Sequence, residues 1–264
     1  MNNLEKHKLY NGAITLFFDP VRHRYIIDDK FIIGVTTVTG VIDKPALINW
    51  AVKITLEYVE ACLQPNKKYH GLEIGEIIAA AREQHTIRKT DAASLGTKAH
   101  LWAESYIKGE KPKTPKDKKI KLVTNNFLQW IDEYKVKFLE REKKVYSRKY
   151  NYAGTIDFEA EINGELCIGD FKTSSGIWDD YRLQIAAYNA ARTEETGNDY
   201  KASWIVKFAK ELDKEEYTKP FEALYIPKEE HEKDFQAFLG ALSLKRRLLE
   251  LEREKKIKRL QKEL

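Results

Sequence analysis

Two stretches of the chain have the residue pattern of β-strands, and in the second of them apolar and polar residues alternate with a period of two. The first covers 14–33 and is broken by Asp19-Pro20 and Asp28-Asp29, two turn-forming pairs, so we expect short strands in a small sheet or hairpin. The second covers 145–173. It contains Asn163-Gly164, the strongest short-range signal for a hairpin turn, and therefore predicts a β-meander.

Elsewhere the apolar residues recur at helical spacing. Pro45 suits the first turn of a helix, and Gly109 suits the residue that follows one. Pro112 and Pro115 mark a linker between two helices. The predicted helices cover 45–63, 74–85, 94–109, 121–140, 179–192 and 228–264, and two further strands cover 202–208 and 221–226.

This order of elements predicts an α/β fold, with a mostly helical subdomain on the N-terminal side of the sheet. A chain of 264 residues suffices for one sizeable core or two modest domains. We expect a hairpin and helical cover over 1–93, a core over 94–227 and a long basic helix over 228–264.

Composition excludes several classes of protein. No apolar stretch reaches the roughly 18 residues that cross a bilayer, and the first residues lack a signal-peptide pattern. We therefore expect a cytoplasmic protein without membrane contact. Cys62 and Cys167 are too few for a disulfide framework, a four-cysteine zinc site or an iron–sulfur cluster. The sequence contains no Walker A pattern, so we expect no nucleotide-binding site.

Positive charge is concentrated in two segments. Residues 241–264 hold nine Lys or Arg against four Glu, which equals the +5 net charge of the whole chain, and 108–121 holds seven lysines. Such runs suit a phosphate backbone, although many are only solvated faces. The C-terminal helix also has an alternative role as a coiled-coil arm for self-association, with an apolar stripe formed by Leu242, Leu249, Leu260 and Leu264.

The candidate chemistry lies in the meander. Asp157 and Asp170 fall on adjacent strands joined by the Asn163-Gly164 turn, and pairing about that turn can bring their side chains together. Two adjacent carboxylates repel unless a cation neutralises them, and Mg²⁺ or Mn²⁺ is the usual one. Lys172 lies two residues beyond Asp170 and projects to the same face. The structural alternative is two strand-end acids beside a surface lysine.

Other polar residues can extend this site. Gly96, His100 and Glu104 share a helix face, and so do Gln184 and Tyr188. Each of these residue types also occurs at ordinary structural positions on helices. Glu142, just before the meander, can turn an acid towards the same strand edge or remain a solvated charge.

Together these residues resemble the ordered motifs of the PD-(D/E)XK nuclease superfamily in its RecB-like branch. That branch includes phage exonucleases, the mitochondrial genome-maintenance exonuclease and CRISPR-associated RecB-like nucleases. The segments 23–30 and 35–38 also resemble the front end of phage members. The matching motifs are Gly96-Thr-x-x-His100, Glu142, Gly154-Thr-Ile-Asp157, Asp170-Phe-Lys172-Thr and Gln184-x-x-x-Tyr188.

The resemblance implies a restriction-endonuclease-like mixed sheet flanked by helices, and a role for each motif residue. His100, Asp157, Asp170 and the carbonyl of Phe171 would hold Mg²⁺ or Mn²⁺. Lys172 would orient or activate the attacking water. The further catalytic residues implied are Gln184, Tyr188 and Glu142. The Pro-Asp of the family is Ile156-Asp157 here, and the four cysteines of some members are absent, so no iron–sulfur cluster is expected.

The implied activity is hydrolysis of DNA phosphodiester bonds by an exonuclease, through in-line attack of a metal-activated water that leaves a 5′-phosphate. Expected partners are single-stranded DNA or duplex ends, and a phage single-strand annealing or binding protein, in the host cytoplasm. Two other functions remain open: a structure-selective endonuclease, and a catalytically silent DNA-binding module. Trp50, Tyr58 and Trp102 are candidates for base stacking or for the core.

Overall fold

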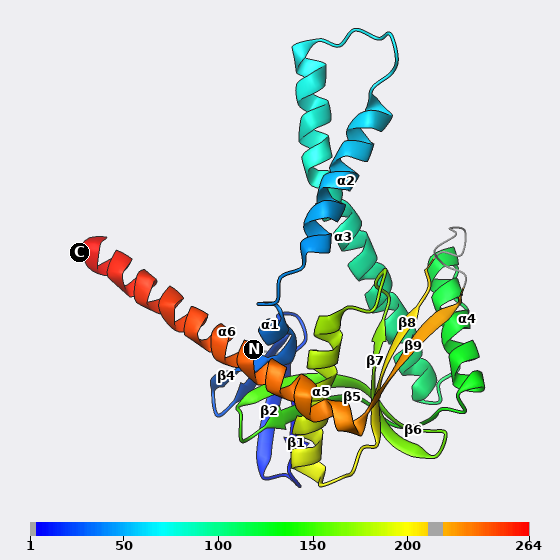
Figure 1. Ribbon diagram of the computed structural model, residues 1–264, viewed down its shortest axis with the longest axis vertical. Coiled ribbons are helices and arrows are strands. Elements are labelled where there is room, and N and C mark those ends of the chain that lie inside the picture. The colour runs from blue at the N-terminus through cyan, green and yellow to red at the C-terminus, as the bar shows by residue number, and fades with distance from the viewer. Residues whose placement is uncertain (1–3, 211–218, 264) are drawn as a thin grey trace. The chain divides into compact units, whose positions relative to one another are not determined.

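The computed structural model describes residues 4–210 and 219–263 (Figure 1). Its strands are β1 (Glu5–Leu9), β2 (Ile14–Asp19), β3 (Arg24–Ile27), β4 (Lys30–Gly34), β5 (Lys137–Ser147), β6 (Tyr152–Ile162), β7 (Glu165–Lys172), β8 (Ala202–Phe208) and β9 (Phe221–Pro227). Its helices are α1 (Val35–Thr39), α2 (Pro45–Cys62), α3 (Gly71–Ile107), α4 (Lys118–Glu133), α5 (Asp179–Thr196) and α6 (Lys228–Glu263).

The chain divides into two compact units. The larger comprises Met1–Ile42 with Trp102–Leu264, and the smaller comprises Asp43–Leu101. The smaller unit is a helical hairpin of α2 and most of α3, with an ion pair of 3.5 Å between Arg88 and Glu57. The predicted domain division at 93 and 227 stays a prediction.

A mixed sheet forms the centre of the larger unit. Within the described residues it has nine strands in the order β1-β2-β3-β4-β6-β7-β8-β9, with β5 paired to β6. The β4–β6 and β7–β8 pairs are parallel and the other pairs are antiparallel. Helices flank this sheet, and the fold is the predicted mixed α/β type, consistent with a restriction-endonuclease-like architecture.

Two clusters of side chains hold the helices on the sheet. Helices α5 and α6 lie against one another and pack on the sheet through a core that includes Ile185 and Phe238 (Figure 1). Helix α4 instead contributes Phe127 and Trp130 to an aromatic cluster with sheet residues such as Phe171. Among the described residues no helix is both long and apolar enough to span a membrane.

The hairpin signal is confirmed. Asn163 and Gly164 have φ of 51° and 83°, the left-handed values that a two-residue turn of this kind requires, and β6 and β7 pair on either side of them. The strands predicted within 14–33 are also present. Through β4 they join the central sheet, and β1, which the periodicity did not predict, pairs with β2.

Two helix predictions are wrong in extent. The helices expected over 74–85 and 94–109 are one helix, α3, because the residues between them include neither Pro nor Gly to interrupt it. The helix expected over 121–140 ends at Glu133, and β5 begins at Lys137. Lys135 has φ of 51°, which reverses the chain, and Phe138 reaches the aromatic cluster from a strand instead of a helix.

Candidate metal centre

The candidate site lies where two strands part. β6 pairs with β7 as far as Phe158 and Gly169, whereas its earlier residues Tyr152 and Ala153 pair with β4. Because β5 occupies the other edge of β6 throughout, β4 and β7 share one edge of β6 in succession. Asp157 and Asp170 are the first residues beyond the last β6–β7 pair. The divergence of the strands therefore leaves both carboxylates at the opening of a fork.

Short contacts join the residues of this fork. The backbone N–H of Phe171 donates a hydrogen bond of 2.7 Å to Asp157 Oδ2, so β7 fixes the carboxylate of β6. On the other side, Arg141 pairs with Phe158 and Lys143 with Ile156, which places Glu142 opposite Asp157. Three acidic residues thus stand in one row across β5, β6 and β7.

Lys172 lies within this acidic group. Its ammonium contacts Asp170 Oδ2 and sits 4.6 Å from the ring centroid of Tyr181. Burial disfavours the charged form of this lysine, but the Asp170 and Asp157 carboxylates outweigh that effect and raise the pKa of Lys172. The side chain is therefore a fixed cation. The sequence prediction that Asp170 and Lys172 face the same side agrees with their contact.

Helix α5 supports the row from the side. Gln184 Nε2 donates to Asp170 Oδ1 at 3.1 Å and to the Tyr188 hydroxyl at 3.0 Å. Burial, followed by the Asp170 carboxylate, raises the pKa of Tyr188 well above its usual value, so this phenol stays neutral. A Cβ at Gly154 would lie 2.4 Å from Tyr188 Cε1, so glycine is needed for the ring to approach β6 this closely.

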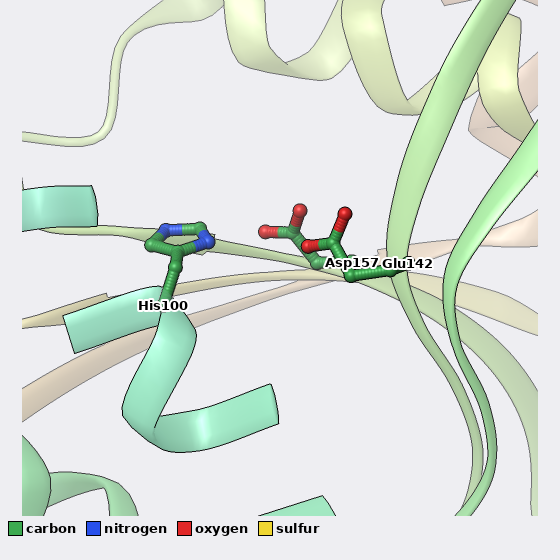
Figure 2. Close-up of side chains that lie close together, drawn as sticks. All are labelled: His100, Glu142 and Asp157. Atoms are coloured by element: carbon green, nitrogen blue, oxygen red, sulfur yellow. The ribbon is translucent and has the colours of Figure 1, made fainter. Parts of the chain in front are cut away.

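His100 is the imidazole predicted for the site. It lies on α3, two residues before Trp102. One ligand atom from each of His100, Glu142 and Asp157 lies within 4.8 Å of the others. Figure 2 shows these three side chains converging. Nitrogen and carboxylate oxygen donors at this spacing suit a first-row divalent cation or Mg²⁺.

The electrostatics of the fork favour a cation. Burial, and then repulsion from Asp170, raises the pKa of Asp157 to about 8, although Lys172 and the Phe171 N–H oppose the shift. Asp170 is 3% exposed, and its Oδ2 lies against Lys172 without a hydrogen bond of normal geometry. A buried carboxylate oxygen in this state can still coordinate a positive ion. The donor set therefore fits a hard divalent ion.

Other predicted residues have local partners. Glu104 forms an ion pair of 2.8 Å with Lys108. Trp102 stacks on Tyr106 and donates through Nε1 to the Lys113 carbonyl, so this indole packs on its own unit.

The sequence reasoning missed two residues that adjoin the motif residues along the chain. Lys144 is a buried lysine that contacts Glu142, and Trp178, just before α5, is a large aromatic side chain that is 41% exposed. A lysine in Lys143-Lys144 gives no sign of burial in sequence. For Trp178 the available signal was its position between the Asp170-x-Lys172 motif and the next helix.

Comparison with known proteins gives limited information. No family model matches the sequence, and no curated protein matches it. Among solved structures, the alkaline exonuclease LHK-Exo from Laribacter hongkongensis is 12% identical with a TM-score of 0.31, over 67% of this chain and 87% of that one. LHK-Exo in complex with dAMP is 14% identical with a TM-score of 0.31, over 61% and 85%. SSO0001 is 14% identical with a TM-score of 0.33, over 75% and 86%. Similarity at this level says nothing about the reaction of this chain.

Proposed function

We propose that this chain is a metal-dependent DNA nuclease of the PD-(D/E)XK superfamily, in its RecB-like branch. The observation that carries the proposal is the fork between β6 and β7. Asp157 and Asp170 lie next to each other there, and the Lys172 ammonium contacts Asp170. Two acids and an amine on diverging strands are the groups that hydrolysis of a phosphodiester needs: ligands for a cation, and a fixed positive charge beside them.

The residues that would hold Mg²⁺ or Mn²⁺ are Asp157, Asp170, the carbonyl of Phe171, His100 and Glu142. When bound, such a cation supplies Lewis acidity that polarises a phosphoryl oxygen and lowers the pKa of a water molecule. Cellular abundance favours Mg²⁺, whereas the imidazole of His100 favours Mn²⁺.

The chain's own residues do the rest. Lys172 orients the attacking water and stabilises the charge that develops on the phosphate, because its ammonium is held at the acidic row by Asp170 and Tyr181. Gln184 fixes the Asp170 carboxylate through Oδ1, and the other oxygen, which contacts Lys172, would be the one offered to a cation. The neutral Tyr188 accepts from Gln184, so its own hydroxyl proton is available to a phosphate oxygen.

The mode of action that we propose is exonucleolytic, on single strands or duplex ends, with products that carry a 5′-phosphate. A phage role in DNA recombination, repair or processing, with a single-strand annealing or binding protein as partner, follows from the motif resemblance described above. The basic α6 would add sequence-independent attraction to the phosphate backbone.

The test is a digestion of end-labelled single-stranded and duplex DNA with Mg²⁺ or Mn²⁺. We expect the wild type to release nucleotides from ends, and Lys172→Ala to lose at least about a hundredfold in rate, the order associated with removal of one group that stabilises transition-state charge. Lys201→Ala is the control, since that exposed lysine pairs with Asp199 at 2.6 Å outside the fork.

Two outcomes would contradict the proposal in different ways. Equal rates for the wild type and Lys172→Ala would remove the catalytic assignment and favour a silent DNA-binding module. Rapid cutting of a covalently closed single-stranded circle would retain the nuclease and replace the exonuclease with an endonuclease.

A further inference from the structure

Lys144 is a buried cation beside the acidic row. Its side chain is 6% exposed, and among the described lysines only Lys144 and Lys207 are buried. The Lys144 ammonium lies 3.6 Å from Glu142 Oε2 and donates to the backbone carbonyl of Glu142 at 3.4 Å. It also lies 4.5 Å from the ring centroid of Phe18 on β2. Burial of an ammonium is costly unless its position is specified by such contacts.

Glu142 has an unusual backbone. Its φ is 44°, in the left-handed region that bulky residues avoid, although it lies inside a strand. The paired residues of β5 pass from Arg141 to Lys143, on either side of it. A left-handed residue inside a strand turns its own side chain and carbonyl away from the alternation of its neighbours, and it persists only where surrounding contacts hold it.

These observations coincide at one residue. The group that reaches the rotated carbonyl of Glu142 is the same ammonium that contacts its carboxylate, and Phe18 fixes that ammonium from the other side by a cation–π contact. Phe18 belongs to the apolar cluster of the N-terminal strands. A connection therefore runs from those strands through Lys144 to the acidic row.

We propose that Lys144 is a positioning residue, which holds Glu142 in its left-handed conformation and so directs the Glu142 carboxylate to the cation beside Asp157. This inference rests on the metal centre of the proposed function. It assigns Lys144 no contact with substrate. It also gives the N-terminal strands a part in the assembly of the site, because they supply the aromatic ring on which the ammonium rests.

The charge of Lys144 also acts on metal affinity directly, and this effect has the opposite sign to the positional one. A positive charge close to a cation site repels the cation, so removal of Lys144 by itself would tighten metal binding. The positional effect and the repulsion are separable, because only the positional effect acts through Glu142. Truncation of Glu142 must abolish the first and leave the second.

The experiment is a double-mutant cycle on Mn²⁺ affinity, measured by electron paramagnetic resonance of free Mn²⁺ in the absence of DNA. The four proteins are the wild type, Lys144→Met, Glu142→Ala and the double variant. We expect Lys144→Met to weaken Mn²⁺ binding about tenfold or more in the wild-type background, the range found when groups that orient ligands are removed, and not to weaken it in the Glu142→Ala background.

Two further variants complete the design. Lys143→Met is the matched control, since that neighbour pairs with Glu140 at 3.9 Å and its side chain is 29% exposed, and we expect its Mn²⁺ affinity to equal that of the wild type. Lys144→Arg keeps the charge and the donors and should recover part of the affinity. If Lys144→Met does not unfold cooperatively on heating, Lys144→Gln takes its place in the cycle.

The inference is overturned if Lys144→Met binds Mn²⁺ as tightly as the wild type or more tightly, or if it weakens binding equally in both backgrounds. If the wild type cuts DNA and binds Mn²⁺, and Lys144→Met binds Mn²⁺ with the same affinity, only the inference about Lys144 is overturned. A wild type that binds no Mn²⁺ and cuts no DNA would overturn the proposed function and this inference with it.

Discussion

At Asp157, burial and the charge of Asp170 act in the same direction, and both favour the protonated carboxyl group. Its carboxyl group is partly buried next to Asp170, and it accepts a hydrogen bond of 2.7 Å from the Phe171 N–H. The acidic pair can be proposed from sequence because a tight turn joins the two strands that carry it. Protonation of Asp157 in the absence of a cation depends on burial, which the sequence does not show.

Without divalent cations, the stability of the protein should therefore depend on Asp157. Its pKa is about 8 in the folded chain and near 3.8 when exposed. Between these values the folded chain binds the proton and the unfolded chain does not, so the free energy of unfolding should fall as pH rises from about 4 to 8 and then level off. Urea unfolding in the presence of a chelator, repeated across that pH range, measures this free energy of unfolding.

Asp157→Asn is the comparison for this measurement. The amide does not titrate, so the downward slope over this interval should be reduced in the variant. An unchanged slope would show that another group carries the pH dependence. Asp157→Asn should also lose the increase of Mn²⁺ affinity with pH that the wild type owes to release of this proton.

At the scale of elements, β6 and α5 are brought together by the smallest side chain between them. Tyr188 lies over Gly154, and its hydroxyl accepts from the same Gln184 that orients Asp170. Periodicity predicts both the helix and the strand. Their close approach is visible in sequence only as Gly154 within a strand, and a glycine there can equally mark a bulge.

Gly154→Ala should displace the Tyr188 ring, because the new Cβ would lie 2.4 Å from its Cε1. We expect a decrease of about 1–3 kcal/mol in the free energy of unfolding, as for other overpacked sites, and a lower nuclease rate through the disturbed Gln184. Chemical denaturation and the end-labelled DNA assay measure the two effects.

Gly240→Ala provides the control for that substitution. Gly240 lies on α6 with nothing within 4 Å of its added Cβ, so alanine should stabilise the helix by about 0.5–1 kcal/mol. If Gly154→Ala were as stable and as active as the wild type, the proposed link from Tyr188 to Asp170 would be wrong.

Element boundaries show where periodicity fails. The spacing of Trp130 and Phe138 fits one helical face, yet Trp130 is on α4 and Phe138 on β5, with ring centroids 6.3 Å apart. Both side chains pack in the same cluster. An apolar residue in the sequence therefore indicates burial, and only its neighbours in space decide which element buries it.

At the scale of the whole molecule, the basic end of α6 extends beyond the sheet (Figure 1). Residues 252–262 are exposed, whereas Leu242 near the middle of the helix packs in the core. Leu242 is thus occupied within its own chain and cannot join a coiled-coil stripe. Leu264, another member of that stripe, lies outside the described residues. Phosphate binding and self-association both stay proposals for this arm.

Replacement of five of the six basic residues of the arm by Gln should weaken DNA binding while stability is retained, since all five are exposed: Lys255, Lys256, Lys258, Arg259 and Lys262. The dependence of affinity on salt should also become less steep, by about 0.7 in the logarithmic slope for each phosphate of a single strand that is no longer neutralised. Fluorescence anisotropy with labelled DNA and Ca²⁺ over a salt series measures both.

An unchanged salt dependence would show that the arm does not bind DNA. Sedimentation equilibrium of the same variant tests the alternative. A change in molecular mass relative to the wild type would indicate that the arm mediates self-association.

By itself, the sequence determined the strands of the meander, the Asn163-Gly164 turn, and the acids and lysine that this hairpin carries. These features follow from local chemistry: alternation with the strand period, left-handed turn residues and a short separation along the chain. The tertiary structure alone decided the replacement of β7 by β4 along β6, the left-handed Glu142 and the burial of Lys144 beneath Phe18. The first and the last of these depend on contact between segments more than a hundred residues apart, and such contacts leave no period in the sequence.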